Sequence, residues 1–321
     1  MTETALSPLD VRLVAALQVN GRASWEQLGE VLRVSERTVA RRLNPLLGSG
    51  AVKVRAVRNP FAMPEVTPLV LRVRCRPGHV LALAEALARR EDCLEASVLD
   101  GGDEVVAIMF MAGAERRRAF LLKYLPASKS VRSWSVYTVL RVFLESLWWH
   151  ADVLTDEEVT ALRPHGLVPA AFEQVSDPVE LAVIEALSRD GRLGYPDLAR
   201  LVGTSESTVR RRVARIARRG ALRIATEVDI ALLGYQVEAN LWLSVPPAAI
   251  DRVGLLLSRH PATRLVMATS GPCTLFVSVY CRDLAELYRL LTEFVGEQAE
   301  VTHLETTPIM HVLKRSGSGT H

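Results

Sequence analysis

Apolar residues at the start of the chain recur with helical spacing. Leu9, Leu13 and Leu17 are four residues apart and therefore share one face of a predicted helix. Ser24 begins the segment SWEQ, which is typical of a capping box and predicts the start of a second helix. Ser35 has the position of an N-cap for a third helix. Two helices joined by a short turn, the second of them capped by Ser, form a helix-turn-helix pattern.

Further along the chain the pattern changes to alternation. In the segment LRVRC at 71–75, apolar side chains alternate with Arg72 and Arg74, as in a strand with one buried face. A DGGD turn at 100–103 separates two later strands. The predicted order is β-α-β-β-α-β, the ferredoxin-like arrangement, with a helix from residue 80, strands at 93–99 and 104–111, a helix through residues 120–124 and a last strand at about 130–142.

The whole pattern occurs twice. Residues 10–54 align with residues 180–224 without a gap, at an offset of 170, and thirteen of these 45 positions are identical. The alternating half recurs at the same offset, with segments at 237–245, 248–259, 263–269, 270–273, 274–281, 283–295 and 300–313. The chain is therefore a tandem duplication.

The duplication predicts how the sheets are covered. An antiparallel sheet with helices on one face leaves its other face exposed, and the second copy supplies a sheet that can pair with it. The predicted fold class is α+β, a duplicated unit of a winged-helix-like helix-turn-helix domain and a ferredoxin-like domain. The predicted domains are helix-turn-helix domains at 1–60 and 177–228, ferredoxin-like domains at 66–145 and 235–315, a linker at 146–176 with a short helix from Asp156 to Arg163, and a tail at 316–321.

Composition narrows the class of protein. The chain has 321 residues, of which 49% are hydrophobic and 23% charged, as in an ordinary globular protein. Its first residues have no basic and apolar leader pattern, and the apolar run at 105–112 is too short to span a bilayer, so we expect a cytoplasmic protein. Four scattered cysteines and seven histidines show no metal-ligand spacing, so we expect no metal and no cofactor.

The net charge is only +3, but the basic residues are concentrated on the third helix of each repeat. Residues 205–223 contain seven Arg and one acidic residue. With Val39 at the centre of the buried face, Arg37, Arg41 and Asn44 lie on the opposite face at 100° per residue. Such a helix fits the major groove of DNA, where Arg pairs with guanine edges and Ser, Thr and helix N-terminal amides hold phosphates. The alternative is an amphipathic helix whose Arg face is only solvated.

The two third helices are expected to be unequal. Pro45 lies inside the first of them, removes the hydrogen bond to residue 41 and is expected to kink the helix, so we expect repeat 2 to carry more of the affinity. The predicted partner is double-stranded DNA, read as an imperfect palindrome with half-sites about one turn apart. The candidate DNA-binding residues are Ser35, Arg37, Thr38, Arg41, Arg42, Asn44, Ser205, Ser207, Thr208, Arg210, Arg211, Arg212 and Arg215.

The order of elements, with SESTVRRRVARIARRG followed by VDIALLGYQVEANLWL, resembles the Lrp/AsnC (feast/famine) transcription regulators over the whole chain, twice. The resemblance implies homo-oligomers, with a pseudo-dimer inside this chain, and a small-molecule effector bound near the turn between the second and third strands. A tight turn with positive φ is the alternative role of Gly101 and Gly271. Carried over by position, the effector region is Asp100, Gly101, Gly102, Asp103 and Glu104 in repeat 1 and Ser270, Gly271, Pro272, Cys273 and Thr274 in repeat 2.

Two alternatives stay open. Siroheme decarboxylases of the haem pathway resemble the same paired halves, but a His on the hairpin of the second and third strands is missing here. No P-loop, dinucleotide-binding glycine run, GxSxG or HExxH motif occurs either, so the sequence predicts that the chain is not an enzyme. The other alternative is a structural partner protein with a contact at SLWWHA, residues 146–151.

Overall fold

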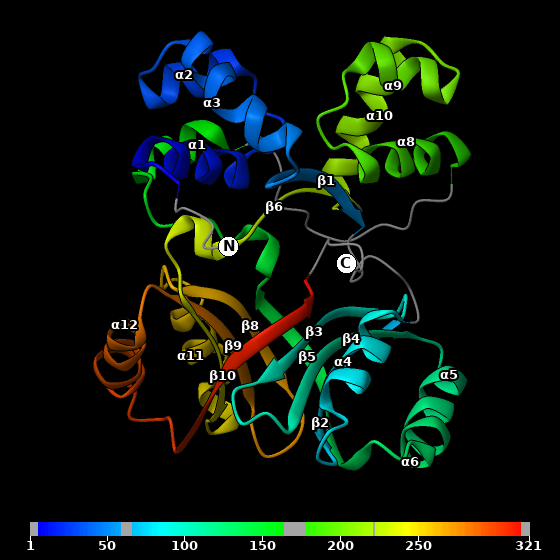
Figure 1. Ribbon diagram of the computed structural model, residues 1–321, viewed down its shortest axis with the longest axis vertical. Coiled ribbons are helices and arrows are strands. Elements are labelled where there is room, and N and C mark those ends of the chain that lie inside the picture. Colours follow the sequence, from blue (N-terminus) through cyan, green and yellow to red (C-terminus); the bar gives the residue numbers. More distant parts are fainter. Residues whose placement is uncertain (1–5, 59–65, 164–176, 221, 316–321) are drawn as a thin grey trace. The chain divides into compact units, whose positions relative to one another are not determined.

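The computed structural model describes residues 6–58, 66–163, 177–220 and 222–315. The chain divides into two compact units, each discontinuous in sequence (Figure 1). The helical unit consists of Met1–Pro64 and Leu147–Gly234, and the barrel unit consists of Glu65–Ser146 and Tyr235–His321. Each unit therefore combines the corresponding halves of the two sequence repeats.

The helical unit contains two helix-turn-helix motifs. Ser24 and Ser35 cap the second and third helices as predicted, since their side chains accept hydrogen bonds from the backbone amides of Gln27 and Thr38. Ser205 does the same for Thr208 in the second repeat. The helices are α1 (Pro8–Val19), α2 (Trp25–Leu32) and α3 (Glu36–Gly48) in the first repeat, and α8 (Pro178–Arg189), α9 (Tyr195–Val202) and α10 (Glu206–Arg218) in the second.

Backbone conformation explains where the helices end. Gly50 and Gly220 have φ of 77° and 65°, so both third helices are followed by a residue in the left-handed region that favours glycine. Helix α3 continues through Pro45 to Gly48. The proline lies in the last turn, where it removes one hydrogen bond without ending the helix at once.

One short ribbon joins the two motifs. Strands β1 (Val52–Arg58) and β6 (Leu222–Val228) pair antiparallel, with Val52 opposite Val228. The strand β1 of the first repeat packs against α8 of the second, where Ala56 is part of the apolar core around Val183 and Leu187. Strand β1 thus completes the core of the second repeat, and β6 contacts α1 of the first repeat, where the Thr226 hydroxyl donates to the Leu17 carbonyl.

The segment between the repeats also packs on the first motif. Helix α7 (Asp156–Leu162) begins with a capping box formed by Thr155 and Glu158. Arg12 forms an ion pair of 2.5 Å with Glu158, and the Asn20 side chain donates to the Leu162 carbonyl. The helix predicted from residue 156 is therefore part of the folded helical unit.

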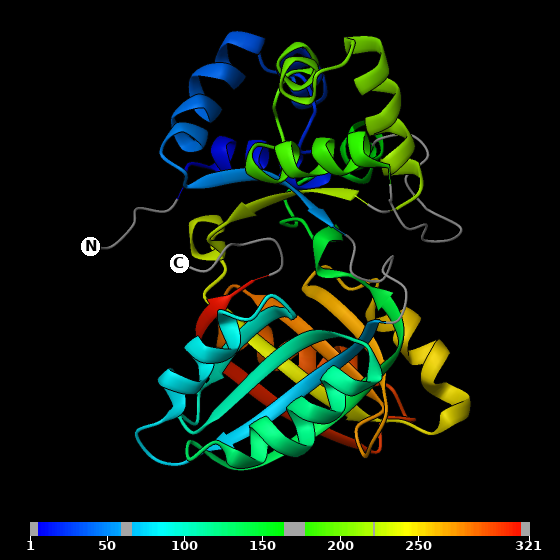
Figure 2. The ribbon, with the colours of Figure 1, turned by 90° about the vertical axis from the view of Figure 1, so that its right-hand side faces the viewer.

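The barrel unit is a closed eight-stranded barrel in the order β10-β3-β4-β2-β5-β8-β9-β7. Figure 2 shows the blue-green strands of the first repeat and the yellow-to-red strands of the second around one interior, with the helices outside. The strands are β2 (Val66–Cys75), β3 (Cys93–Leu99), β4 (Glu104–Ala112), β5 (Val131–Leu144), β7 (Val237–Ser244), β8 (Thr263–Thr269), β9 (Leu275–Cys281) and β10 (His303–Lys314). The outer elements are α4 (Val80–Ala88), α5 (Ala114–Ala119), η2 (Phe120–Tyr124), α6 (Leu125–Ala127), η5 (Pro247–Ala249), α11 (Ile250–Leu257), α12 (Leu284–Arg289) and η6 (Leu290–Val295).

The two long strands close the barrel. Strand β5 pairs with β2 of its own repeat up to Thr138 and with β8 of the other repeat from Val139 onward. Strand β10 makes the equivalent switch from β7 to β3 after Pro308. A register shift follows each switch, at the equivalent residues Leu140 and Met310. Such bulges bend a strand, and closure leaves neither sheet with an open edge.

Apolar and polar residues are sorted between the two faces of the sheets. Between each sheet and its helices lies an apolar core, which includes Leu71 and Met109 in repeat 1 and Leu241 and Val277 in repeat 2. The interior of the barrel also holds charged side chains. No helix among the described residues has the length and apolar character needed to cross a bilayer. The α+β class with duplicated helix-turn-helix and ferredoxin-like halves is confirmed.

Candidate nucleic-acid interface

Helices α3 and α10 each bury one face in their motif. Val39 and Leu43 of α3, like Val209 of α10, are buried, which turns the opposite face outward. Arg41 and Arg211, at equivalent positions, are exposed. No carboxylate of the described residues forms an ion pair with either guanidinium, so both are available to an anionic partner. The other candidates on this outward face are Arg37, Asn44 and Ser207, all exposed.

Two predicted candidates on α10 are instead used inside the motif. Arg215 donates from Nε to Glu180 Oε1 over 2.5 Å, and Glu180 on α8 is only 1% exposed. Arg212 forms an ion pair with Asp177, the N-cap of α8, and its hydrogen bond lowers the pKa of that carboxyl. Because their carboxylate partners lie at the start of α8, these arginines hold α10 against α8.

The first repeat has a weaker version of this pairing. Arg42 lies 3.4 Å from Asp10, the residue equivalent to Glu180. In the second repeat, Arg210 forms an exposed ion pair of 2.8 Å with Glu206 and lies over the Tyr195 ring at 4.5 Å. Exposed pairs of this kind are worth less than about 1 kcal/mol, so a phosphate can replace the carboxylate.

Hydroxyl groups gather at the N-termini of both third helices. Ser35 and Thr38 are hydrogen-bonded over 2.9 Å. Ser205 bonds Ser207 over 3.1 Å and Thr208 over 2.8 Å. The structure thus brings the predicted Ser and Thr residues together beside exposed helix N-termini, where backbone amides attract phosphate.

The two predicted effector turns lie in the barrel unit. Gly271 has the positive φ that a tight turn requires, 96°, as predicted. In repeat 1 the expectation for Gly101 is wrong, because the residue with positive φ is its neighbour Gly102, at 72°. Asp103 lies 3.5 Å from Arg74, whereas Glu104 is buried and accepts from Arg72 over 2.8 Å. Of this turn, Asp100, Gly101, Gly102 and Asp103 are exposed.

The repeat-2 turn is tied to neighbouring strands. Ser270 exchanges hydrogen bonds with the Thr138 backbone, its Oγ accepting over 2.9 Å. The Pro272 carbonyl accepts from Ser244, and Thr274 Oγ1 accepts from the amide of Val245. Cys273 is buried, and its carbonyl accepts from the Thr269 hydroxyl. These contacts occupy most polar atoms of the turn, and Gly271 and Pro272 remain exposed.

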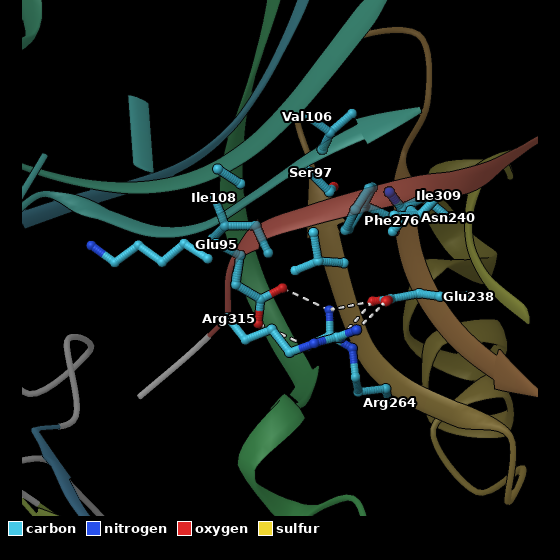
Figure 3. Close-up of a pocket in the computed structure, with 13 residues that line it drawn as sticks. Glu95, Ser97, Val106, Ile108, Glu238, Asn240, Arg264, Phe276, Ile309 and Arg315 are labelled. Carbon is cyan, nitrogen blue, oxygen red and sulfur yellow. Dashed lines mark hydrogen bonds and ion pairs between the residues drawn. The ribbon is translucent and has the colours of Figure 1, made fainter. Parts of the chain in front are cut away.

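Sequence reasoning missed a charged cluster inside the barrel (Figure 3). Arg264 donates to both oxygens of Glu95 over 2.8 and 2.6 Å, and Arg315 donates to both oxygens of Glu238 over 3.1 and 2.8 Å. Arg315 also donates to the Tyr280 hydroxyl, and burial raises the pKa of that phenol. The cavity beside the cluster has about 20 Å³, room for one water. The one sequence signal was a charged residue within each otherwise apolar strand, Glu95 in β3 and Arg264 in β8.

A second cluster lies between β2 and β10. Arg72 donates to Glu305 through two nitrogens over 2.9 and 2.8 Å, and this contact lowers the pKa of the Glu305 carboxyl. Arg72 also lies over the ring of Trp242, whose indole donates to Thr307 over 3.0 Å. Like the first, this cluster joins a strand of one repeat to a strand of the other.

Comparison with known proteins agrees with the duplicated motif. The sequence profile of the AsnC-type helix-turn-helix domain matches residues 6–47 and 177–216. The profile of the Lrp/AsnC ligand binding domain matches residues 238–318. An uncharacterised HTH-type transcriptional regulator of Pyrococcus abyssi is 30% identical over 139 residues, which cover 88% of that protein and 43% of this chain. A similar regulator of Pyrococcus horikoshii is 28% identical over 148 residues, covering 94% of that protein and 46% of this chain. Each relative corresponds to one repeat.

A likeness over the full length corrects one expectation. The crystal structure of the siroheme decarboxylase NirDL covers 95% of this chain and 92% of its own, with a TM-score of 0.63 and 12% identity. The prediction that the chain is not an enzyme is therefore wrong, because a chain with this fold over its full length can be an enzyme. At 12% identity the likeness concerns the fold alone.

The sequence relatives and the profiles point in one direction. Both helix-turn-helix motifs match the AsnC type, the second ferredoxin-like half matches the ligand-binding domain, and the relatives are HTH-type transcriptional regulators. The chain belongs to the Lrp/AsnC family of DNA-binding transcription regulators, as a tandem duplication of the family's unit.

Proposed function

We propose that one chain reads an imperfect DNA palindrome with its two unequal third helices, α3 and α10. The observation that carries this proposal is the pair of exposed arginines, Arg41 and Arg211, at equivalent positions of two capped helices in one unit. An exposed guanidinium on such a helix can pair with a guanine edge. The hydroxyls and helix N-termini around Ser35 and Ser205 would hold the flanking phosphates.

The two half-sites would differ in sequence. On its outward face α3 presents Arg37, Arg41 and Asn44, and α10 presents Ser207 and Arg211. Arg and Asn pair with different base edges, guanine and adenine respectively, so α3 offers an adenine contact for which α10 has no equivalent. That repeat 2 carries more of the affinity stays a prediction. Arg212 and Arg215 do not add to it, because their guanidinium groups are paired with carboxylates of Asp177 and α8.

The test begins with selection of bound duplexes from a random library by the purified chain. Affinity for the selected duplex is then measured for Arg41→Ala and Arg211→Ala across a salt series. Each substitution is expected to weaken binding by about 5- to 150-fold, corresponding to about 1–3 kcal/mol for a base contact. Arg118→Ala, which removes one exposed arginine of the barrel unit, is the matched control and leaves affinity unchanged. Absence of any enriched sequence would overturn the proposal.

For the barrel unit we propose a small-molecule effector at the exposed parts of the two turns, Gly101 to Asp103 and Gly271 to Pro272. The family profile for a ligand-binding domain, which matches residues 238–318, supports this role for the repeat-2 turn. Further association of chains and a cytoplasmic location belong to the same proposal. The effector site is tested by the shift in melting temperature of the protein with single amino acids and other metabolites. A compound that raises the melting temperature should lose this effect in Gly271→Val, where a Cβ would lie 3.3 Å from the Tyr137 ring.

A second candidate function rests on the likeness of the whole fold to NirDL. NirDL has also been crystallised with an iron-uroporphyrin III analogue. Titration of the chain with that analogue, followed by absorbance of the tetrapyrrole, separates the two candidates. A saturable spectral shift at one equivalent would favour an enzyme, and its absence together with sequence-specific DNA binding would favour the regulator.

A further inference from the structure

Two equivalent arginines connect the helix-turn-helix motifs reciprocally. Arg22 of repeat 1 donates to the carbonyls of Gly191 and Leu193 in repeat 2, over 2.6 and 3.1 Å. Arg192 of repeat 2 donates to the carbonyls of Gly21 and Ala23 in repeat 1, over 2.7 and 3.0 Å. Each guanidinium uses both terminal nitrogens, which fixes its orientation as well as its distance. We call these two residues and their contacts the arginine clasp.

Each clasp arginine also lies over an aromatic ring of the other repeat. The Arg22 guanidinium is 4.9 Å from the Tyr195 ring centre, and that of Arg192 is 4.0 Å from the Trp25 ring centre. Tyr195 and Trp25 are the first residues of α9 and α2, the helices that precede the two candidate recognition helices. The clasp therefore holds the start of each helix-turn-helix motif directly.

The loops of the clasp are pressed onto the ribbon. A Cβ on Gly21 would lie 2.7 Å from Ile224 and 2.9 Å from Val54, and one on Gly191 would lie 2.9 Å from the Arg55 amide. The Gly191 amide donates to the Val54 carbonyl over 2.7 Å. Both loops thus need glycine to reach the ribbon, and the ribbon and clasp together form one contact zone between the motifs.

The clasp brings two like charges into a half-buried site. Burial and the nearby Arg22 lower the pKa of Arg192 to about 10. Holding two cations close together opposes the folded state, so the carbonyl and ring contacts must outweigh this repulsion. Contacts that only joined the two motifs would not need two neighbouring positive charges. Two guanidinium groups that each donate two hydrogen bonds also fix the orientation of one motif relative to the other.

We propose that the arginine clasp sets the separation of α3 and α10 and so determines which half-site spacing the chain accepts on DNA. This inference rests on the proposed function, since spacing has meaning only if both helices read DNA. Ribbon strands alone can twist and slide, whereas the clasp adds side-chain hydrogen bonds of fixed geometry from the loops beside the ribbon. Arg22 and Arg192 act here as positioning residues and need not touch the DNA.

The first test changes the spacing of the selected duplex by one to five base pairs. For the wild type, a change of five base pairs, about half a turn, is expected to cost at least about 10-fold in affinity. In Arg22→Ala/Arg192→Ala the same change is expected to cost less than about 3-fold, while affinity for a duplex with one half-site stays within about 2-fold. Arg22→Lys/Arg192→Lys keeps the charge but loses the forked donors, and should behave like the alanine pair.

The matched control is Arg89→Ala/Arg189→Ala, which removes two exposed arginines whose partners are Glu85 and Glu185. It should keep the spacing preference of the wild type. If the alanine and lysine pairs also keep that preference, the inference is overturned. Far-UV circular dichroism of each variant shows that the helices are still folded.

The second test needs no DNA. Spin labels at Glu30→Cys and Arg200→Cys, equivalent exposed positions on α2 and α9, report the distance between the motifs, and the four native cysteines are buried. The distance distribution is expected to be narrow with the clasp and at least about 2-fold broader without it, because two elements move more freely once a contact that fixes them is released. An unchanged distribution would overturn the clasp even if DNA binding is found. A wild type that selects no duplex would instead overturn the proposed function and leave the distance result to decide the clasp alone.

Discussion

Arg264 lies between two carboxylates, Glu95 and Glu238, inside the barrel and is 6% exposed. Replacing Arg264 takes from Glu95 the guanidinium that holds both of its oxygens, whereas Arg315 still pairs with Glu238. Breaking a buried ion pair in this way costs about 3–5 kcal/mol. Arg264→Gln is therefore expected to lower the midpoint of thermal unfolding by several degrees. Differential scanning calorimetry measures this midpoint. The control is Arg189→Ala, which removes an exposed ion pair on α8 and should cost less than about 1 kcal/mol of stability. Equal shifts for both variants would mean that the buried cluster is not what stabilises the barrel.

Glu227 on the ribbon makes stability depend on pH. Burial raises the pKa of its carboxyl from near 4.5 to about 7, against the attraction of Arg55 and of its cross-strand partner Lys53. The folded state thus binds a proton that the unfolded state releases, so the contribution of Glu227 to stability is largest below pH 4.5 and falls until about pH 7. Glu227→Gln should remove this fall, so that the variant exceeds the wild type in melting temperature most clearly above pH 7. If the melting temperatures of the two proteins changed with pH in parallel, the fall in stability would not come from the Glu227 carboxyl.

Single residues also mark how far sequence reasoning reaches. Periodicity placed Arg41 on the outward face, and Arg211 with it at the offset of 170 residues, because that placement depends only on the 100° step of a helix. It did not separate Arg211 from Arg215, whose partner Glu180 lies 35 residues away in the chain. Which arginine pairs with another element depends on how the helices pack, and the sequence of one helix alone does not show this.

Helix α3 offers a test at the scale of one element. Pro45 occupies its last turn, where an alanine would restore the amide that can donate to the Arg41 carbonyl. Pro45→Ala is expected to raise the free energy of unfolding by about 1 kcal/mol, which is less than the cost of a proline at a helix centre. Urea denaturation followed by circular dichroism measures it. Ala214→Gly, a change at an exposed position of α10, should lower stability by a similar amount. A less stable alanine variant would show that the proline's restriction of the unfolded chain outweighs the lost bond.

The strands show a second limit at this scale. Alternation predicted the strand at about 130–142, close to Val131–Leu144 as observed. It gave no sign that β5 changes partner at Thr138 or that Leu140 is a bulge residue. An alternating pattern tells which face of a strand is buried, but the neighbouring strand is chosen by closure of the whole barrel.

At the scale of the whole molecule, the repeat in sequence is not the division in space. Two equal halves of the chain would suggest two similar bodies, yet both helix-turn-helix motifs lie in one unit and both sheets in the other. The reason is that each half-sheet needs a partner for its inner face and each ribbon strand packs against a helix of the other repeat. The chain thus contains within itself the pairings for which a protein of one repeat would need a second copy.

That internal pairing predicts the stoichiometry on DNA. The relatives have the length of one repeat, whereas this chain carries both helix-turn-helix motifs in one unit, so one chain should occupy both half-sites of a duplex. Labelled duplex, at a concentration well above the dissociation constant, is titrated with the protein and its fluorescence anisotropy is measured. The titration should reach equivalence at one chain per duplex. At low duplex concentration the isotherm should be hyperbolic, because both recognition helices are on one chain and binding therefore needs no prior association of chains. Equivalence at two chains per duplex, with a sigmoidal isotherm, would mean that each chain uses one recognition helix and that the tandem arrangement serves another purpose. A duplex with a single half-site is the control, since it should bind one chain with lower affinity in either case.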